Sequence, residues 1–385
     1  MSHLVDEHRQ YLADRPRISA FDRAIQRVVK RGDVVLDLGS GSGILGLLAC
    51  RAGASRVYSV EEGGMIEFAQ KVCAANGFQE RVRFIKGLST RVELPEKVHV
   101  VVADQIGRFG FEAGLLEYYA DARTRFLAPG GVMIPARLDL CVAPVECAEV
   151  FERIEFWNDS PLDFDFRPAR TWAVNTAYPT KLRPEHLLGG PATIASLDMS
   201  TAEPEALSLE AAVTADKDGT LHGIGGWFTA QLSEGIEMSN SPLSAEPINR
   251  MNVVFPIDRP TPLRRGDCVR VTMRILPSEL LVTWTVEVEF AANEDQERRP
   301  RPTSFTHSTF KGMLVSKEDI LRTRPDFVPK LSPWGEARHT ILNLCDGRRS
   351  LAEIEREVYG NHAKLFSSAG QAAAFVAEVV TRYSQ

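Results

Sequence analysis

A glycine-rich segment between a buried strand and a helix constrains the fold of this chain most. Residues 34–38, Val-Val-Leu-Asp-Leu, form a short apolar run typical of a strand inside a parallel sheet. Gly39, Gly41 and Gly43 follow directly, and residues 44–52 have the pattern of a helix closed by a glycine. Such a turn brings free backbone N–H groups close to a ligand, so we predict a cofactor site here.

Strands and helices alternate from residue 34 to about residue 135. This alternation predicts a Rossmann-type α/β domain with a doubly wound parallel sheet and an N-terminal helix over residues 1–137. The last predicted helix, residues 115–127, ends before Pro129-Gly130-Gly131. The other predicted strands are residues 56–60, 82–85 and 98–103, and the other predicted helix is residues 64–76.

The pattern changes after residue 138, where apolar and polar residues alternate as in sheets with one buried face, for example in residues 269–275 and 280–288. We predict a β-barrel-like domain over residues 138–300, with a helical arm as an excursion over about 150–200. Residues 293–302 are predicted to be a polar linker, and residues 305–385 a small C-terminal helical or winged-helix domain.

Charge and cysteine usage narrow the classes of function. The net charge of −6 gives no general attraction to phosphate backbones or anionic lipids, so neither nucleic acid nor a membrane is expected as a partner. The six cysteines form no CxxC pair, which predicts neither a metal site nor a disulfide framework. The first residues lack the apolar stretch of a secretory signal, and we predict a cytoplasmic protein.

An acidic residue, Glu61, ends the next predicted strand, where its carboxylate is able to accept both ribose hydroxyls of a cofactor. A dinucleotide and S-adenosylmethionine are the two candidates. The motif is D-x-G-x-G-x-G rather than G-x-G-x-x-G, and Asp37 before the first glycine suits a cationic methionyl group better than a pyrophosphate. We therefore predict an S-adenosylmethionine-dependent methyltransferase, with Asp37, Gly39, Gly41, Gly43 and Glu61 holding the cofactor.

Several motifs together resemble those of the protein arginine methyltransferases and their bacterial relatives. Residues 35–45, 57–61 and 85–87 are similar to the first three motifs of that family. Residues 103–107 together with Glu112 stand where the family has its double-glutamate loop. The resemblance extends from about His8 to residue 289 and implies N-methylation of a guanidino group, most simply that of arginine in a peptide or protein.

The resemblance also assigns roles to individual residues. His8 to Arg17 is similar to the family's helix that closes over the cofactor, which implies that Arg17 binds the methionyl carboxylate with His8 nearby. Glu112 matches the second glutamate, and Asp104, shorter by one methylene, stands in place of the first. Both carboxylates would hold the guanidinium and localise its positive charge away from the attacking nitrogen.

One departure from the family pattern bears on the substrate. Where the family carries Thr-His-Trp, this chain has Ile248-Asn249-Arg250, which makes Asn249 and Arg250 candidate substrate-binding residues. Either the substrate is positioned differently, or Arg250 meets an anionic group such as a carboxylate. The alternatives are therefore a methyltransferase of free arginine or a related small metabolite, and a cofactor-binding scaffold without turnover.

Two further segments concern partners. Residues 156–188, with Phe164, Phe166 and Trp172, lie where the family has its dimerisation arm, which implies a homodimer. Residues 341–354 resemble the small winged-helix domains that hold peptide precursors in pyrroloquinoline quinone biosynthesis. That second resemblance implies a peptide substrate presented by strand addition, with a structural helical cap as the alternative.

Overall fold

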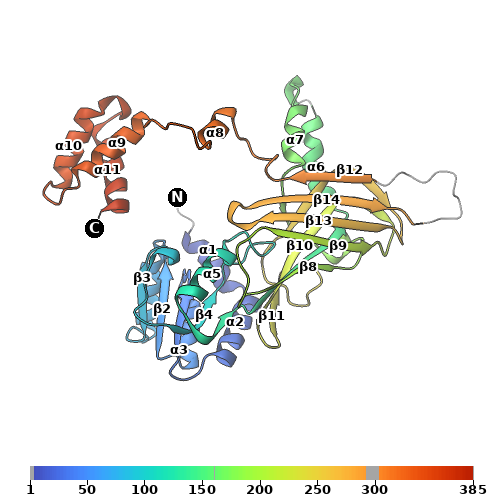
Figure 1. Cartoon of the computed structure of the whole chain (residues 1–385), viewed down its shortest axis with the longest axis horizontal. Coiled ribbons are helices and arrows are strands. Elements are labelled where there is room, and N and C mark those ends of the chain that lie inside the picture. The colour runs from blue at the N-terminus through green and yellow to red at the C-terminus, as the bar shows by residue number, and fades with distance from the viewer. Residues whose placement is uncertain (1–3, 160, 292–302, 385) are drawn as a thin grey trace. The chain divides into compact units, whose positions relative to one another are not determined.

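The structure is a computed structural model that describes residues 4–159, 161–291 and 303–384. The chain divides into two compact units, Met1–Met313 and Leu314–Gln385. Figure 1 shows a parallel sheet with helices and a set of antiparallel strands in the first unit, and helices in the second.

A five-stranded parallel sheet forms the amino-terminal part of the first unit. The strand order is β3-β2-β1-β4-β5, and each pairing is parallel. The order reverses at β1, so the crevice for a ligand opens at the carboxyl ends of β1 and β4. The strands are β1 (Val34–Leu38), β2 (Arg56–Glu61), β3 (Val82–Lys86), β4 (Val98–Ala103) and β5 (Leu127–Ile134).

Helices connect these strands and precede them. Gly43, in the left-handed region, comes directly before α3, and Gly53, with φ +112°, ends it, so both boundaries match the prediction. Asp14 separates the first two helices, and Pro16 stands in the first turn of the second. The helices are α1 (Leu4–Ala13), α2 (Arg15–Val28), α3 (Ile44–Ala52), α4 (Met65–Ala75), the short η1 (Ser89–Arg91) and α5 (Leu115–Arg125).

The fifth strand is a correction to the sequence analysis, which continued the last helix to residue 127 and ended it before Pro129. The helix α5 ends at Arg125, and residues 127–134, including Pro129-Gly130-Gly131, form β5. The pairing of β5 with β4 shifts register between Val98 and Val100. An edge strand tolerates a proline and an irregular glycine pair, because one of its sides forms no ladder hydrogen bonds.

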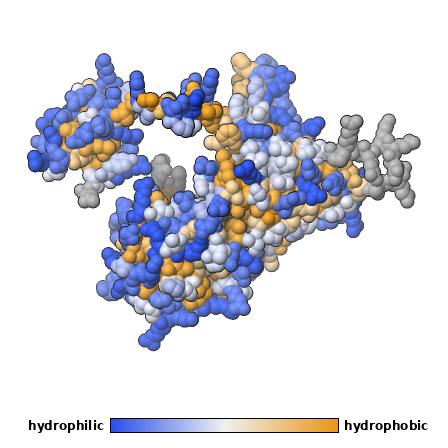
Figure 2. Space-filling view, in the orientation of Figure 1, coloured by the Kyte–Doolittle hydropathy of each residue, from blue (hydrophilic) through white to orange (hydrophobic). Residues whose placement is uncertain are grey.

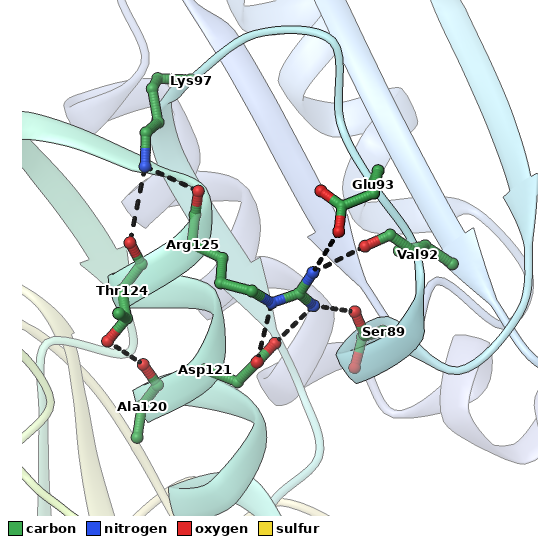
Figure 3. Close-up of polar contacts among 8 residues, drawn as sticks. All are labelled: Ser89, Val92, Glu93, Lys97, Ala120, Asp121, Thr124 and Arg125. Atoms are coloured by element: carbon green, nitrogen blue, oxygen red, sulfur yellow. Dashed lines mark hydrogen bonds and ion pairs between the residues drawn. The ribbon is translucent and has the colours of Figure 1, made fainter.

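Arg125 joins the end of α5 to the loop that follows β3 (Figure 3). Its guanidinium donates to both carboxylate oxygens of Asp121, at 2.9 and 2.8 Å, and to the backbone oxygens of Val92 and Ser89, at 2.7 and 2.6 Å. Glu93 lies 3.6 Å from the same guanidinium. Since η1 begins at Ser89, this network fixes a loop that borders the predicted cofactor site.

Two antiparallel sheets follow the Rossmann-type part. One has the order β7-β12-β10-β6-β8, with β11 paired to β10, and the other has the order β15-β14-β13-β9. They share one apolar core, and the buried indole of Trp284 donates to the backbone oxygen of Pro256 across it, at 2.8 Å. The strands are β6 (Arg137–Val145), β7 (Tyr178–Thr180), β8 (Ala192–Asp198), β9 (Leu207–Thr214), β10 (Gly219–Ser233), β11 (Ile236–Ser239), β12 (Asn252–Leu263), β13 (Cys268–Leu276), β14 (Leu281–Glu289) and β15 (Thr303–Ser308).

A helical arm interrupts this β domain, but it is shorter than predicted. It starts with α6 (Ala148–Glu155) and ends with α7 (Arg170–Ala173). The strands β7 and β8 lie inside the predicted excursion over residues 150–200, yet both pair into the six-stranded sheet. Between the two helices lie the short turns η2 (Phe156–Asn158), η3 (Pro161–Asp163) and η4 (Arg167–Ala169), and η5 (Pro184–His186) follows β7.

The boundary of the C-terminal unit also differs from the prediction, which placed it at residue 305. Residues 303–308 form β15, which pairs with β14 as the edge of the four-stranded sheet, and the second unit begins at Leu314. Alternation of polar and apolar residues in so short a segment is weak, and its pairing partner is what makes it a strand. The predicted linker over residues 293–302 lies outside the described residues.

The second unit consists of helices around a small core that includes Ile341, Val358 and Val376. Serine side chains cap two of its helices: Ser332 accepts from the N–H of Gly335, and Ser350 forms a capping box with Glu353. No strand occurs among residues 314–384, so the helical alternative describes this unit and a winged helix does not. Its helices are α8 (Lys317–Arg322), α9 (Pro333–Leu344), α10 (Leu351–Asn361), η8 (Ala363–Leu365) and α11 (Ala369–Tyr383).

Candidate active site

The glycine-rich loop after β1 has a backbone that requires glycine. Gly39, Gly41 and Gly43 have φ angles of +65°, +50° and +78°. A Cβ atom at Gly39 would lie 2.4 Å from the side chain of Gln105, and one at Gly41 would lie 2.5 Å from the ring of His8. The loop backbone therefore lies directly against His8 and Gln105, which both line a large cavity at this end of the sheet.

Glu61 ends β2 beside this loop. Its carboxylate accepts from the N–H of Gly41 at 2.9 Å and from the N–H of Gly63 at 2.7 Å. A carboxylate has about four acceptor positions, so positions remain for the two ribose hydroxyls that the sequence analysis assigned to it. Glu61 lines a cavity of about 320 Å³, whose wall also contains Gly39 and Gln105.

Asp37 lies elsewhere than the cofactor-binding role would require. Its side chain is fully buried, and one carboxylate oxygen accepts from the N–H of Gly46 at 2.8 Å in the first turn of α3. It lines neither of the two cavities beside the glycine-rich loop. The carboxyl group thus ties β1 to α3, and its effect on a cationic ligand would act through the loop rather than by contact.

We expect Asp37→Asn to stabilise the ligand-free protein more at pH 8 than at pH 5. Burial raises the pKa of Asp37 from 3.8 to about 7, so the folded state keeps a proton that the unfolded chain loses near pH 4. The carboxyl therefore lowers the free energy of unfolding as the pH rises from about 4 to 7, whereas asparagine still accepts from Gly46 and does not titrate. In urea unfolding, the free energy of unfolding of Asp37→Asn minus that of the wild type should be larger at pH 8 than at pH 5, by on the order of 2 kcal/mol. A difference that stays constant with pH would contradict this assignment.

A larger cavity, of about 920 Å³, lies at the carboxyl ends of β1 and β4. Its wall is formed by residues of α1, α2 and the start of α3, of the loops after β1 and β4, and of the segments after β7 and before β12. The predicted site residues on this wall are Arg17, Gly39, Gly41, Asp104, Glu112, Asn249 and Arg250. Sequence positions up to 233 residues apart, from Arg17 to Arg250, thus meet at one cavity.

Arg17 and Asp104 form an ion pair in the wall of this cavity. Their side chains are 10% and 7% exposed, and the Arg17 guanidinium also lies over the ring of Tyr11, 4.8 Å from its centroid. Burial, and next the charge of Arg250, lower the pKa of Arg17 to about 10. The residue predicted for the methionyl carboxylate thus contacts the one predicted for the guanidinium, a pairing that sequence analysis did not foresee.

Glu112 lies eight positions beyond Asp104 in the same loop. Its two carboxylate oxygens accept from the N–H of Phe109, at 2.8 and 3.1 Å. Burial raises its pKa, and the nearby charges of Arg108 and Arg250 act in the opposite direction. The carboxylate is held by the backbone of its own loop, so its position is fixed before any ligand enters.

We expect Gly107→Ala to lower activity strongly by displacing Glu112. A Cβ atom at Gly107 would lie 2.0 Å from a carboxylate oxygen of Glu112 and 2.8 Å from its backbone nitrogen. A displacement of about 1 Å in a catalytic group costs on the order of 10²-fold in rate. The matched control is Gly64→Ala, because a Cβ atom there meets nothing within 4 Å. Steady-state methyl transfer measured on both variants checks this, and equal activities would contradict the role of Gly107.

Asn249 and Arg250 both line the large cavity, in different environments. The backbone N–H of Asn249 donates to Asp14 at 2.8 Å, and its side chain is exposed. The Nη1 atom of Arg250 is buried and has no hydrogen-bond partner among the described residues. Burial lowers the pKa of Arg250, while Tyr11, Glu112 and Asp14 raise it.

The cavity wall also contains polar and charged residues to which sequence reasoning gave no role, among them Gln105, Arg108 and Lys181. Arg108 lies between Asp104 and Glu112 in the chain, so its position in the predicted loop was a usable signal. Lys181 directly follows β7, and no local pattern indicates that it approaches the loop after β4. Among the described residues, no group of three or more His, Cys, Asp or Glu side chains is arranged to hold a metal ion.

Two family models match this chain, and their ranges meet where the parallel sheet ends and the antiparallel sheets begin. The family model described as "Arginine methyltransferase oligomerization subdomain" matches residues 136–295. The family model described as "Ribosomal protein L11 methyltransferase (PrmA)" matches residues 22–135. The first range begins next to Arg137, where β6 starts.

Curated relatives extend the likeness over most of the first unit. The chain is 30% identical to protein arginine N-methyltransferase 6 of Danio rerio over 291 residues, which cover 71% of this chain and 82% of the relative. It is 31% identical to protein arginine N-methyltransferase 6 of Xenopus laevis over 256 residues, which cover 63% of this chain and 75% of that protein.

Solved structures support the same fold. The Trypanosoma brucei PRMT1 enzyme–prozyme heterotetrameric complex with AdoHcy contains a chain that matches with a TM-score of 0.70 at 21% identity, covering 80% of this chain and 100% of that chain. Protein arginine methyltransferase 10 of Arabidopsis thaliana matches with a TM-score of 0.67 at 24% identity, covering 78% and 97%. The predicted fold class, a Rossmann-type domain followed by a barrel-like β domain, is confirmed.

Proposed function

Because this chain belongs to the protein arginine N-methyltransferase family, we propose that it methylates arginine in a peptide or protein, with Glu112 and Asp104 holding the guanidinium. Membership of the family confirms the predicted reaction class and the predicted cofactor, S-adenosylmethionine. The observation that carries the assignment of residues is the cavity whose wall contains both carboxylates and the glycine-rich loop.

The residues present fit the cofactor. Gly39 and Gly41 line the large cavity with backbone that carries no side chain, and Glu61 lines the adjoining cavity with free acceptor positions. We assign the ribose to Glu61 and the methionyl carboxylate to Arg17, which is buried beside the loop. When bound, S-adenosylmethionine supplies an electrophilic methyl group on its sulfonium.

Two carboxylates answer the chemical problem of a guanidinium acceptor, which is protonated and a poor nucleophile. Glu112, fixed by Phe109, holds one edge of the guanidinium. Asp104 holds the other edge once Arg17 turns from it to the cofactor carboxylate. Charge then localises on the nitrogens that the carboxylates contact, and the remaining nitrogen keeps electron density for attack. Burial lowers the dielectric around both contacts and strengthens them.

A methyl-transfer assay with the full chain tests this function. An arginine-containing peptide, the same peptide with lysine in place of arginine, and free arginine are each offered with radiolabelled cofactor. Methylated arginine after acid hydrolysis of the first peptide, with none from the lysine peptide, supports the proposal. Methylation of lysine alone would overturn it, and cofactor binding without transfer to any acceptor would favour the scaffold alternative.

We also propose that the chain forms a homodimer through the helical arm. The chain carries the oligomerization subdomain of the family, and several large apolar side chains of the arm are exposed. Figure 2 shows apolar and hydrophilic residues side by side on this arm. Exposed apolar patches of this kind are typical of protein–protein contacts. The exposed residues are Phe156, Leu162, Phe164, Phe166 and Trp172.

We expect Leu162→Ser combined with Phe164→Ser to convert a dimer into monomers, because these side chains are 89% and 66% exposed and contribute little to the core of the single chain. Sedimentation velocity measures the change, and the exposed pair Leu280→Ser and Leu314→Ser, outside the arm, is the control. A dimer that survives the arm substitutions would contradict the proposed interface.

We also propose that the protein works in the reducing environment of the cytoplasm. All six cysteines are free, and Cys50, Cys73, Cys141 and Cys147 are buried, as expected where thiols stay reduced. The described residues contain no helix with the length and apolar character needed to span a membrane.

A further inference from the structure

The large cavity carries more cationic than anionic side chains on its wall. Among the described residues that line it, Arg17, Arg108, Lys181 and Arg250 are cationic, and Asp104 and Glu112 are anionic. His8 adds little positive charge near neutral pH, since burial lowers its pKa. A site for a guanidinium cation would ordinarily carry the opposite balance, because like charges in a partly buried cleft repel.

The pairing within the cavity leaves Arg250 without an anion. Asp104 forms an ion pair with Arg17, and Glu112 accepts from the N–H of Phe109 with both oxygens. No ion pair of Arg250 occurs among the described residues, and its Nη1 atom is buried without a hydrogen-bond partner. A buried guanidinium nitrogen with an unsatisfied donor is costly, so such a group is retained where a ligand supplies the missing acceptor.

The position of Arg250 indicates which ligand supplies the missing hydrogen-bond acceptor. Arg250 and Glu112 line the same cavity, and the charge of each acts on the pKa of the other, so we place the partner of Arg250 beside the guanidinium that Glu112 would hold. The methionyl carboxylate is already assigned to Arg17. The methyl acceptor must therefore supply the group that Arg250 binds. A carboxylate matches the planar fork of a guanidinium with two parallel hydrogen bonds.

We propose that the methyl acceptor carries a carboxylate close to its guanidino group and that Arg250 binds this carboxylate, assisted by Arg108 and Lys181 at the rim. This inference rests on the proposed arginine methylation and names its substrate class. The carboxylate has two possible sources. It is either the α-carboxylate of free or C-terminal arginine, or the side chain of an acidic residue next to an arginine in a peptide.

Acceptor pairs that differ only in the carboxylate test the proposal and separate the two sources. One pair is L-arginine and L-argininamide, and the other is a peptide with aspartate beside its arginine and the same peptide with asparagine. We expect kcat/KM to be about tenfold higher or more for the carboxylate member of at least one pair, as charge-assisted hydrogen bonds give. The pair that shows the preference identifies the source.

Substitution of Arg250 connects the preference to this residue. In Arg250→Gln the ratio of kcat/KM within the preferred pair is expected to fall toward one, and Arg250→Lys is expected to retain part of it. Arg274→Gln, on an exposed position of β13, is the matched control and should keep the full ratio. Thermal unfolding of each variant shows whether the chain is folded.

The outcomes distinguish this inference from the function on which it rests. Equal methylation of both members of each pair by the wild type overturns the carboxylate proposal and leaves arginine methylation intact. An equal rise in activity toward all acceptors in Arg250→Gln also overturns it, because Arg250 would then occupy the acceptor position itself. Absence of methylation on every arginine acceptor instead removes the proposed function.

Discussion

Replacing Glu112 by glutamine is expected to lower kcat/KM for an arginine acceptor by about 10²- to 10³-fold and to leave cofactor affinity unchanged. The glutamine oxygen still accepts from the N–H of Phe109, so the loop keeps its geometry. What is lost is the negative charge at the edge of the guanidinium. Steady-state methyl transfer and calorimetric titration with the cofactor measure the two quantities separately.

The same substitution at Glu117 serves as the control for Glu112. Glu117 lies in the first turn of α5, is exposed and does not line the large cavity. Glu117→Gln is therefore expected to keep wild-type kinetics. Full activity in Glu112→Gln would remove this carboxylate from the acceptor site and with it the proposed arrangement of the pocket.

The pH dependence of kcat/KM offers a second test of the role of Glu112. Burial raises the pKa of its carboxyl group, so in the ligand-free enzyme the proton is lost at a higher pH than in an ordinary glutamate. Only the ionised form attracts a guanidinium by charge. We therefore expect kcat/KM of the wild type to fall as the pH is lowered through this raised pKa, and the residual activity of Glu112→Gln to lack that acid limb.

Replacing Arg17 by methionine is expected to have two separable effects. Loss of the proposed contact to the methionyl carboxylate should weaken cofactor binding by about 10- to 100-fold, as expected for charged hydrogen bonds. The substitution also leaves Asp104, whose side chain is 7% exposed, without its cation, which should lower the free energy of unfolding by about 3 kcal/mol.

A second substitution separates stability from binding. In the double variant with Asp104→Asn no buried charge is left unpaired, so we expect most of the lost stability to return while cofactor affinity stays low. Arg27→Met, on the same helix, is the control, because its ion pair with Glu234 is exposed and contributes little. Titration with the cofactor and urea unfolding check both quantities. If the double variant recovers no stability, so that the two changes in the free energy of unfolding simply add, the buried ion pair is contradicted.

Local patterns predicted most of the parallel sheet correctly, and they failed where pairing outweighed composition. The loop at Gly39 to Gly43 and the end of β2 at Glu61 follow from signals within a few residues. Residues 127–134 were not predicted as a strand, because Pro129-Gly130-Gly131 has the composition of a turn. Similarly, residues 303–308 become a strand through their pairing with β14.

By itself, the sequence determined the glycine-rich turn, the acidic end of β2 and the two carboxylates of the loop after β4. These features depend on backbone conformation and on residues close together in the chain. Only the tertiary structure decided that Arg17 pairs with Asp104, that Asp37 is buried away from both cavities, and that Arg250 and Lys181 line the same cavity as Glu112. The physical reason is that the pairing of buried charges depends on which distant segments the packed sheets bring together, and no local spacing encodes that proximity.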